Sequence, residues 1–231
     1  MSLAVHELRT PVTVVSGYLR MLLRDQAGPL NDKQRKMLEE ADRSCSRIGA
    51  LVTEMSELGK LESEMPTLSG PEFDLSSLMT EVASGMHEGE DRGITLKTRG
   101  TDQPVMVAGD RPRLAAVLRA LMHASLRERA DSGVIIADCS TFSDSNHAWA
   151  IVAIGADADV RVLAEAGREA TPDFDEWRGG LGLALPVGRR VIEAHGGALW
   201  SAPGDTPRAG SAFRIPLGSR VSTDPLHPTK G

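Results

Sequence analysis

Two long amphipathic helices constrain the fold of this chain more than any other feature of its sequence. Between residues 3 and 25, apolar residues recur at alternating spacings of three and four, at Val5, Leu8, Val12, Val15, Leu19 and Leu22. That spacing is typical of a helix packed in a bundle or coiled coil. Gly28-Pro29 ends the pattern, and Asn31 or Asp32 is expected to cap a second helix.

The second helix repeats the signal and is expected to end before Pro66. Its seam positions follow the same spacing, at Met37, Ala41, Ser44, Ile48, Leu51, Met55 and Leu58, and its outer face is charged. A single hairpin cannot cover both of its apolar faces, whereas two hairpins paired as a four-helix bundle can. We therefore predict that residues 1–65 form a homodimerisation module.

The chain changes character after a linker at residues 66–72. Strand-like alternation is mixed with helical spacing over residues 73–217. The predicted helices cover 75–86, 113–127 and 183–195, and the predicted strands cover 94–98, 105–107, 134–139, 148–154, 198–202 and 211–217. Residues 156–180 read as irregular, and 218–231 as a loose tail. The expected fold class is α+β: a helical hairpin forming a dimeric bundle, followed by an α/β sandwich.

Charge and cysteine content narrow the class of function. The net charge is −6 and the basic residues are scattered, which argues against nucleic acid as a partner. Cys45 and Cys139 lack metal-ligand spacing and are expected to be reduced, partly buried thiols. No apolar run approaches the roughly 18 residues that a membrane span needs. We expect a cytoplasmic chain whose helical start indicates a missing upstream part.

His6 lies on the flank of the first predicted helix, between the seam residues Val5 and Leu8. Glu7 is adjacent, and Thr10 is one helical turn further on. An exposed imidazole beside a carboxylate can act as a nucleophile, because the carboxylate holds the ring in the required tautomer. A solvent-facing histidine without a reactive role is the alternative that the spacing alone leaves open.

The stretch HELRTP, from His6 to Pro11, resembles the phosphoacceptor box of sensor histidine kinases of two-component systems. The rest of the chain is similar to the ATP-binding domain that this family shares with gyrase-type ATPases. The resemblance implies that His6 accepts phosphate at nitrogen, with Glu7 as its acid/base partner. Thr10 has the position that orients the attacking water in members that dephosphorylate their regulator.

The resemblance also implies partners and cofactors. It implies ATP and Mg²⁺, a homodimer through residues 1–65, and a response-regulator receiver domain with an acceptor aspartate. The intact protein would then meet a membrane only through the missing upstream region.

A glycine-rich stretch, Gly179-Gly180-Leu181-Gly182, precedes the helix that ends in His195-Gly196-Gly197. It resembles the box that bounds the phosphate side of the family's ATP pocket. Gly180 and Gly182 fall on family glycines, and Ala184 falls on a third. Glycines let the backbone approach phosphate groups, and a helix N-terminus attracts the anion.

The asparagine box of the family is altered. The family has two asparagines four residues apart on the helix after Asp110, and the second one holds Mg²⁺. Here those positions are Ala120 and Ala124, or Arg119 and His123 if the alignment slides by one residue. Neither register offers the neutral oxygen ligand that Mg²⁺ prefers.

The adenine-recognition box is altered too. Gly155 stands where the family has the aspartate that binds the adenine amino group, and Asp157 and Asp159 replace two glycines. Losing one charge-assisted hydrogen bond costs about 1.5–3 kcal/mol, roughly ten- to a hundredfold in affinity. We assign Gly180, Gly182, Asp157, Ala124 and Gly155 to the nucleotide site.

Two functions follow from these residues. In the first, the chain is the core of a sensor histidine kinase that transfers phosphoryl groups through His6 to a receiver aspartate. Its eroded ATP site then leaves autokinase activity weak or absent. In the alternative, it is an inactive, pseudokinase-like scaffold or a phosphatase that docks a response regulator. An unrelated helical interaction protein is a third reading.

Overall fold

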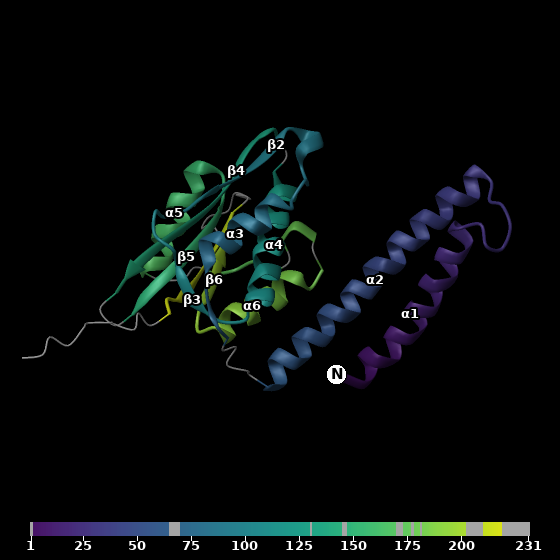
Figure 1. Cartoon of the computed structure of the whole chain (residues 1–231), viewed down its shortest axis with the longest axis horizontal. Coiled ribbons are helices and arrows are strands. Elements are labelled where there is room, and N and C mark those ends of the chain that lie inside the picture. The colour runs from purple at the N-terminus through teal and green to yellow at the C-terminus, as the bar shows by residue number, and fades with distance from the viewer. Residues whose placement is uncertain are drawn as a thin grey trace, which may run out of the picture.

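The computed structural model describes residues 2–64, 70–129, 131–144, 147–169, 173–176, 178–180, 182–201 and 210–218. It consists of a helical hairpin and an α/β sandwich that lies beside it (Figure 1). The predicted order of hairpin and sandwich is therefore confirmed. Most of the predicted linker and nearly all of the predicted tail lie outside the described residues.

The hairpin consists of α1 (Ser2–Leu23) and α2 (Asp32–Glu64). Asn31, rather than Asp32, caps α2: its side chain accepts from the Gln34 N–H at 2.9 Å, and the Gln34 side chain accepts from the Asn31 N–H at 3.0 Å. This reciprocal pair is a capping box. Arg35 then closes the turn, because it donates to Asp25 at 2.8 Å and to the Leu23 carbonyl at 2.9 Å.

The contact between the two helices uses a different face of α2 from the predicted one. Cys45 and Val52 are buried, and the Cys45 thiol donates to the Val12 carbonyl at 3.5 Å. The predicted seam residues Met37 and Ile48 are 62% and 49% exposed. The face that packs on α1 is displaced by one position, so the predicted seam of α2 is not the seam within the hairpin.

The sandwich contains a mixed five-stranded sheet in the order β2-β4-β5-β7-β6. β2 and β4 are parallel, and the other neighbours are antiparallel. The five strands are β2 (Ile94–Arg99), β4 (Gly133–Ser143), β5 (Ala148–Gly155), β6 (Ala198–Ser201) and β7 (Ser211–Pro216). A separate antiparallel pair joins β1 (Glu72–Asp74), which the sequence analysis missed, to β3 (Met106–Ala108).

One face of the sheet carries α3 (Leu75–Ser84), α4 (Arg111–Glu128) and α6 (Ala184–Ala194). Alternate residues of β5 show this division: Val152 and Ile154 belong to the core beneath these helices, whereas Ile151 and Ala153 point to the opposite side. This alternation is the two-residue period of a strand that is buried on both faces. Two short 3-10 helices, η1 (Glu90–Arg92) and η2 (Arg178–Gly180), complete the described elements.

The opposite face is covered by α5 (Asp157–Glu169). The prediction of irregular structure over residues 156–180 is therefore wrong for this part. Val160 and Leu163 are fully buried against the sheet, and the Trp200 indole N–H donates to the Leu163 carbonyl at 3.0 Å. Acidic residues in the first turn complement the helix dipole, which explains why this charge-rich stretch is helical.

The two cysteines, Cys45 and Cys139, are free, as predicted, and both are buried rather than partly buried. Burial raises the pKa of the Cys139 thiol to about 12. Among the described residues, none of the helices combines the length and the apolar character that crossing a membrane requires.

The packing of α5 predicts a specific sensitivity. A Cβ atom on Gly167 would lie 2.2 Å from Cζ2 of the buried Trp200 ring. We expect Gly167→Ala to lower the free energy of unfolding of the sandwich by about 1–3 kcal/mol, the usual cost of overpacking. Urea denaturation followed by tryptophan fluorescence measures this change.

Gly188→Ala is the matched control in the same domain. Its Cβ atom would lie 3.7 Å from the Val117 methyl groups, which is ordinary contact, inside helix α6. We expect this variant to be as stable as the parent, or up to about 1 kcal/mol more stable through helix propensity. Equal effects of the two substitutions would contradict the packing argument.

Candidate functional site

The predicted phosphoacceptor residues lie on the first turns of α1. His6, Glu7 and Thr10 are all exposed, whereas the preceding Val5 is buried against α2. The helix continues through Pro11 without interruption. The imidazole is therefore exposed to solvent, with Glu7 next in the chain, on a helix whose preceding residue Val5 is buried.

The register of the hairpin determines what lies next to His6. Val12 packs near Cys45 and Gly49 of the antiparallel helix α2. His6 is six residues before Val12, or about 9 Å along the helix axis at 1.5 Å per residue. It therefore lies on a level with the part of α2 around Glu54, where the sandwich contacts the hairpin.

The glycine-rich stretch has the backbone conformation that only glycine adopts readily. Gly179, Gly180 and Gly182 have φ angles of 66°, 61° and 65°. All three are left-handed, a region that carries a steric penalty for residues with a Cβ atom. The stretch leads directly into α6, whose N-cap residue is Leu183.

The glycine stretch packs on α4 at the position that the resemblance assigns to the Mg²⁺ ligand. A Cβ atom on Gly179 would lie 2.9 Å from Cα of Ala124, and Ala124 is fully buried. This contact favours the register in which Ala120 and Ala124 replace the family's asparagines.

In the other register, Arg119 and His123 would take the two asparagine positions. His123 bonds through Nδ1 to the Glu88 carboxylate, which also accepts from Arg127 at 2.8 Å. Burial acts to raise the pKa of the Glu88 carboxyl, but the hydrogen bonds from Arg127 and His123 outweigh it and hold that pKa below its ordinary value. Arg119 is exposed.

Gly155 and Asp157 stand at the end of β5 and in the first turn of α5. Gly155 is buried opposite Ile136 of β4. The Asp157 carboxylate accepts from Arg99 Nη1 at 3.1 Å, and the same guanidinium donates from Nε to Asp138 at 2.5 Å. The charge of Asp157 is thus compensated at the edge strand β2.

These residues do not fit a bound ATP·Mg²⁺ of the kind that the resemblance implies. Ala124 offers a buried methyl group where an oxygen ligand is needed, and Gly155 offers no carboxylate to adenine. In the part of the chain that the structure describes, no three His, Cys, Asp or Glu side chains gather as a metal site.

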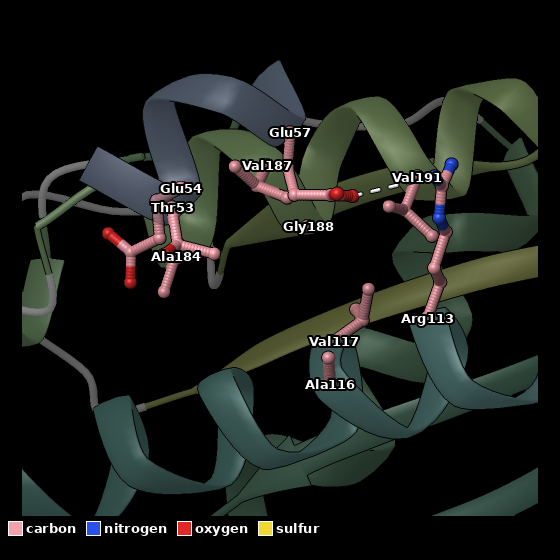
Figure 2. A pocket seen from close by; sticks show the side chains of 10 residues that line it. All are labelled: Thr53, Glu54, Glu57, Arg113, Ala116, Val117, Ala184, Val187, Gly188 and Val191. Carbon is pink, nitrogen blue, oxygen red and sulfur yellow. Dashed lines mark ion pairs between the residues drawn. The ribbon is translucent and has the colours of Figure 1, made fainter. Parts of the chain in front are cut away.

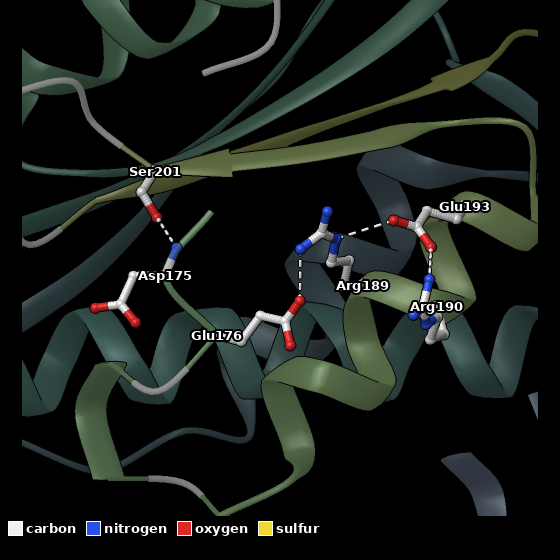
Figure 3. A network of polar contacts seen from close by, with 6 residues as sticks. All are labelled: Asp175, Glu176, Arg189, Arg190, Glu193 and Ser201. Atoms are coloured by element: carbon white, nitrogen blue, oxygen red, sulfur yellow. Dashed lines mark hydrogen bonds and ion pairs between the residues drawn. The ribbon is translucent and has the colours of Figure 1, made fainter. Parts of the chain in front are cut away.

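Sequence reasoning missed a polar network that holds the segment before the glycine stretch. Figure 3 shows Arg189 of α6 between Glu176 and Glu193, at 2.5 and 2.9 Å. Ser201 of β6 accepts from the Asp175 N–H at 3.2 Å. The four-residue spacing of Arg189 and Glu193 was a visible signal, but the contact with Glu176 depends on the tertiary fold.

Sequence reasoning also missed the residues that join the two domains. The Glu54 carboxylate accepts from the Leu183 N–H at 3.0 Å, and the Glu57 carboxylate lies 3.4 Å from the Arg113 guanidinium. Burial raises the pKa of the Glu54 carboxyl, against the opposing effect of the Leu183 hydrogen bond.

An apolar cavity of about 310 Å³ separates these two contacts (Figure 2). Its walls come from α2, α4 and α6, and the side chains that line it include Thr53, Ala116, Val117, Ala184, Val187 and Val191.

His195, the C-cap residue of α6, contacts Asp110, the N-cap residue of α4. Its Nδ1–H donates to the Val191 carbonyl at 2.7 Å, so Nε2 is free to accept from the Asp110 N–H at 3.0 Å. Burial lowers the pKa of His195, and the charge of Arg113 adds to this effect, whereas the Val191 carbonyl and Asp110 oppose it.

Comparison with known proteins agrees with the resemblance to sensor histidine kinases that the sequence indicates. Residues 1–64 match the family model of the His Kinase A (phospho-acceptor) domain. The sensor protein GacS of Pseudomonas syringae pv. syringae is 25% identical over 222 residues, which are 92% of this chain and 24% of GacS. The probable sensor histidine kinase TcrY of Mycobacterium tuberculosis is 29% identical over 222 residues, 93% of this chain and 44% of TcrY.

Among solved structures, full-length ShkA in complex with AMPPNP has a TM-score of 0.68 at 22% identity, covering 94% of this chain and 44% of that one. At this identity the likeness shows the fold. The chain spans less than half the length of these two curated relatives.

The hairpin matches the phospho-acceptor domain model, and the hairpin and sandwich together are similar in sequence to sensor histidine kinases over about nine-tenths of the chain. The resemblance that the sequence indicated is thereby confirmed, with a phospho-acceptor hairpin at residues 1–64.

The environment of His195 predicts a pH dependence of stability. Because its pKa is lowered in the folded state, the fold favours the neutral ring. The resulting stabilisation is fully present above the ordinary pKa of 6.5 and is lost as the pH falls through the lowered value. We expect the free energy of unfolding to decrease between pH 7 and pH 5, measured by urea denaturation.

His195→Gln should make the free energy of unfolding less dependent on pH, by the contribution of up to about one proton taken up on unfolding. Gln presents an oxygen near the Nε2 position but does not titrate. His87→Gln is the control, since His87 is an exposed residue that pairs with Glu90, three residues on. If the parent and His195→Gln have parallel pH profiles, His195 is not the titrating group.

Proposed function

We propose that this chain carries a phosphoryl group on His6 and exchanges it with the aspartate of a response-regulator receiver domain. The observation that carries the proposal is the exposed His6, beside Glu7, on a hairpin that matches the phospho-acceptor model. In relatives named as sensor histidine kinases, the matched region spans both domains of this chain.

The chemistry at His6 follows from its surroundings. A lone pair of an imidazole nitrogen attacks phosphorus, and an N–P bond forms as the bond to the donor's oxygen breaks. The Glu7 carboxylate favours the tautomer with its lone pair on the attacking nitrogen and stabilises positive charge on the ring. In the second transfer, a receiver carboxylate oxygen attacks phosphorus and the N–P electron pair returns to the ring.

We propose further that autophosphorylation from ATP is weak or absent. The support is the buried Ala124 beneath Gly179, together with the missing carboxylate at Gly155. Each lost charge-assisted contact weakens binding by roughly ten- to a hundredfold. The sandwich then serves mainly to regulate the hairpin.

The alternative is a phosphatase or an inactive scaffold that docks the same receiver domain. The same altered positions support it, and the exposed Thr10, one turn from His6, is the residue that we propose orients a water molecule. The two functions differ in whether phosphate remains on His6.

We propose that the chain functions as a homodimer. Large apolar side chains of the hairpin are exposed in the single chain: Leu8, Val14, Val15, Tyr18, Met21, Met37 and Ile48. An apolar face of this size on a two-helix hairpin is expected to be covered by a second copy, as in a four-helix bundle.

The phosphoryl-transfer proposal is tested with two donors. Potassium phosphoramidate, a small histidine-phosphorylating reagent, should label His6, and His6→Ala should lose that label. ATP with Mg²⁺ should give at most about one tenth of this stoichiometry, because the metal and adenine ligands are missing. Mass spectrometry and acid lability identify phosphohistidine.

His87→Ala is the control, because His87 is another exposed histidine and should not affect the label on His6. If phosphoramidate leaves His6 unmodified, His6 is not the acceptor. Full labelling of His6 by ATP would instead rule out an eroded ATP site.

The dimer is tested by Ile48→Asp. Because Ile48 is 49% exposed in the single chain, the substitution should leave the hairpin folded but weaken dimerisation at least about tenfold. Analytical ultracentrifugation gives the dissociation constant. Val162→Asp, at an exposed apolar position of α5, should leave it unchanged. A parent chain that is monomeric at micromolar concentration would refute the bundle.

A further inference from the structure

The cavity between the hairpin and the sandwich has the size of a small-molecule site. Its volume is about 310 Å³, and its walls come from α2, α4 and α6. Figure 2 shows Ala184 and Val187 of α6 across an open space from Ala116 and Val117 of α4. Since an apolar cavity of about 150 Å³ holds benzene, this one has room for a molecule of about two aromatic rings.

The cavity is preformed and reaches solvent. Val117, Gly188 and Val191 line it and are buried, whereas Thr53 and Ala116 line it and are exposed. Further along α2, Leu61 is buried in the core of the sandwich, which fixes the wall that α2 provides. A molecule therefore reaches the buried wall from the exposed side while the hairpin and the sandwich stay in contact.

One polar group at this cavity has unused hydrogen-bonding capacity. Arg113 lines the cavity, and its guanidinium lies 3.4 Å from Glu57 through Nη2 and 3.4 Å from Asp110 through Nε. Its Nη1 atom is buried and has no hydrogen-bond partner among the described residues. A buried donor without a partner costs free energy, which an acceptor on a ligand recovers.

The charges around the cavity restrict the kind of acceptor. The carboxylates of Glu54, Glu57 and Asp110 outnumber the cations Arg113 and Lys60, so an anionic ligand would be repelled. An ammonium group would be attracted, but it has no lone pair to offer to Nη1. A neutral oxygen, such as that of a carbonyl group, avoids the repulsion and accepts from Nη1.

The cavity is separate from the predicted nucleotide site. None of the residues assigned to that site lines it: Gly180, Gly182, Asp157, Ala124 and Gly155. Its walls use the faces of α4 and α6 that are turned toward the hairpin.

We propose that this cavity binds an uncharged, mainly apolar molecule of about two rings, whose acceptor oxygen bonds to Nη1 of Arg113. The bound molecule touches the hairpin and the sandwich at once, so its binding stabilises the contact between them. The proposal does not depend on phosphoryl transfer at His6.

The first test measures dissociation constants by equilibrium dialysis of the full chain. Benzophenone has two rings and a carbonyl oxygen, and diphenylmethane has the same rings without the oxygen. In Arg113→Met, benzophenone should lose about tenfold in affinity relative to diphenylmethane, because a hydrogen bond from a charged donor is lost. Comparing the two ligands removes the effect of the substitution on the apolar walls.

Arg119→Met, at an exposed position of the same helix, is the matched control and should leave the ratio of the two dissociation constants unchanged. If Arg113→Met also leaves that ratio unchanged, or if the parent binds neither ligand up to its solubility limit, the proposal is refuted.

The second test locates the bound molecule. Irradiated benzophenone inserts into neighbouring C–H bonds, so mass spectrometry should find adducts on the peptides that contain Val117 and Val191. Ala116→Phe, which narrows the exposed side of the cavity, should lower the yield of these adducts about tenfold. Adducts confined to other surfaces, such as the exposed apolar residues of the hairpin, would overturn the assignment.

The charge argument is tested with benzhydrylamine, which carries an ammonium group on the same two rings. It should bind the parent about tenfold more weakly than benzophenone, since it leaves Nη1 of Arg113 without a partner. Equal or tighter binding of the amine contradicts the proposed ligand class. The same results are expected in His6→Ala, so a failure of His6 to accept phosphate refutes the proposed function and leaves the cavity site standing.

Discussion

The close approach of a glycine backbone to two helices organises this protein. Gly179 lies against Ala124 of α4, and Gly182 lies against Leu51 of α2, in both cases at distances that a Cβ atom would not allow. The glycine stretch therefore lies at the contact between the sandwich and the hairpin. Once it is in place, Glu54 reaches the amide of Leu183, and α6 gains a cap.

The contact between the glycine stretch and α4 also bears on whether the site can hold a metal ion. A small residue at position 124 lets the glycine stretch settle on α4, and a small residue also removes the oxygen that a metal ion would need. His6, the proposed phosphoacceptor, remains exposed on α1. These two features are the support for our proposal that phosphoryl exchange at His6 matters more than nucleotide turnover.

Much of the architecture was predictable, because it depends on local periodicity. The three-four spacing of α1 and the alternation of β2 specify a helix and a strand before any tertiary contact forms. The missed elements lack such a signal. β1 is three residues long, and α5 mixes acidic residues with an apolar stripe that matters only when the sheet presents Trp200 to it. The face of α2 that packs on α1 was misjudged by one position, because both neighbouring faces carry apolar residues.

Local spacing in the sequence specified the hairpin, the order of the two domains, the HELRTP stretch at His6 and the glycines before α6. These follow from spacing and from the steric limits of the backbone, which act within a few residues. Only the tertiary structure decided that Ala124 lies beneath Gly179, that Asp157 is neutralised by Arg99, and that Glu54 caps α6. Such contacts join residues far apart in the chain, and charged side chains on a helix surface carry no local mark of the partner that folding brings to them.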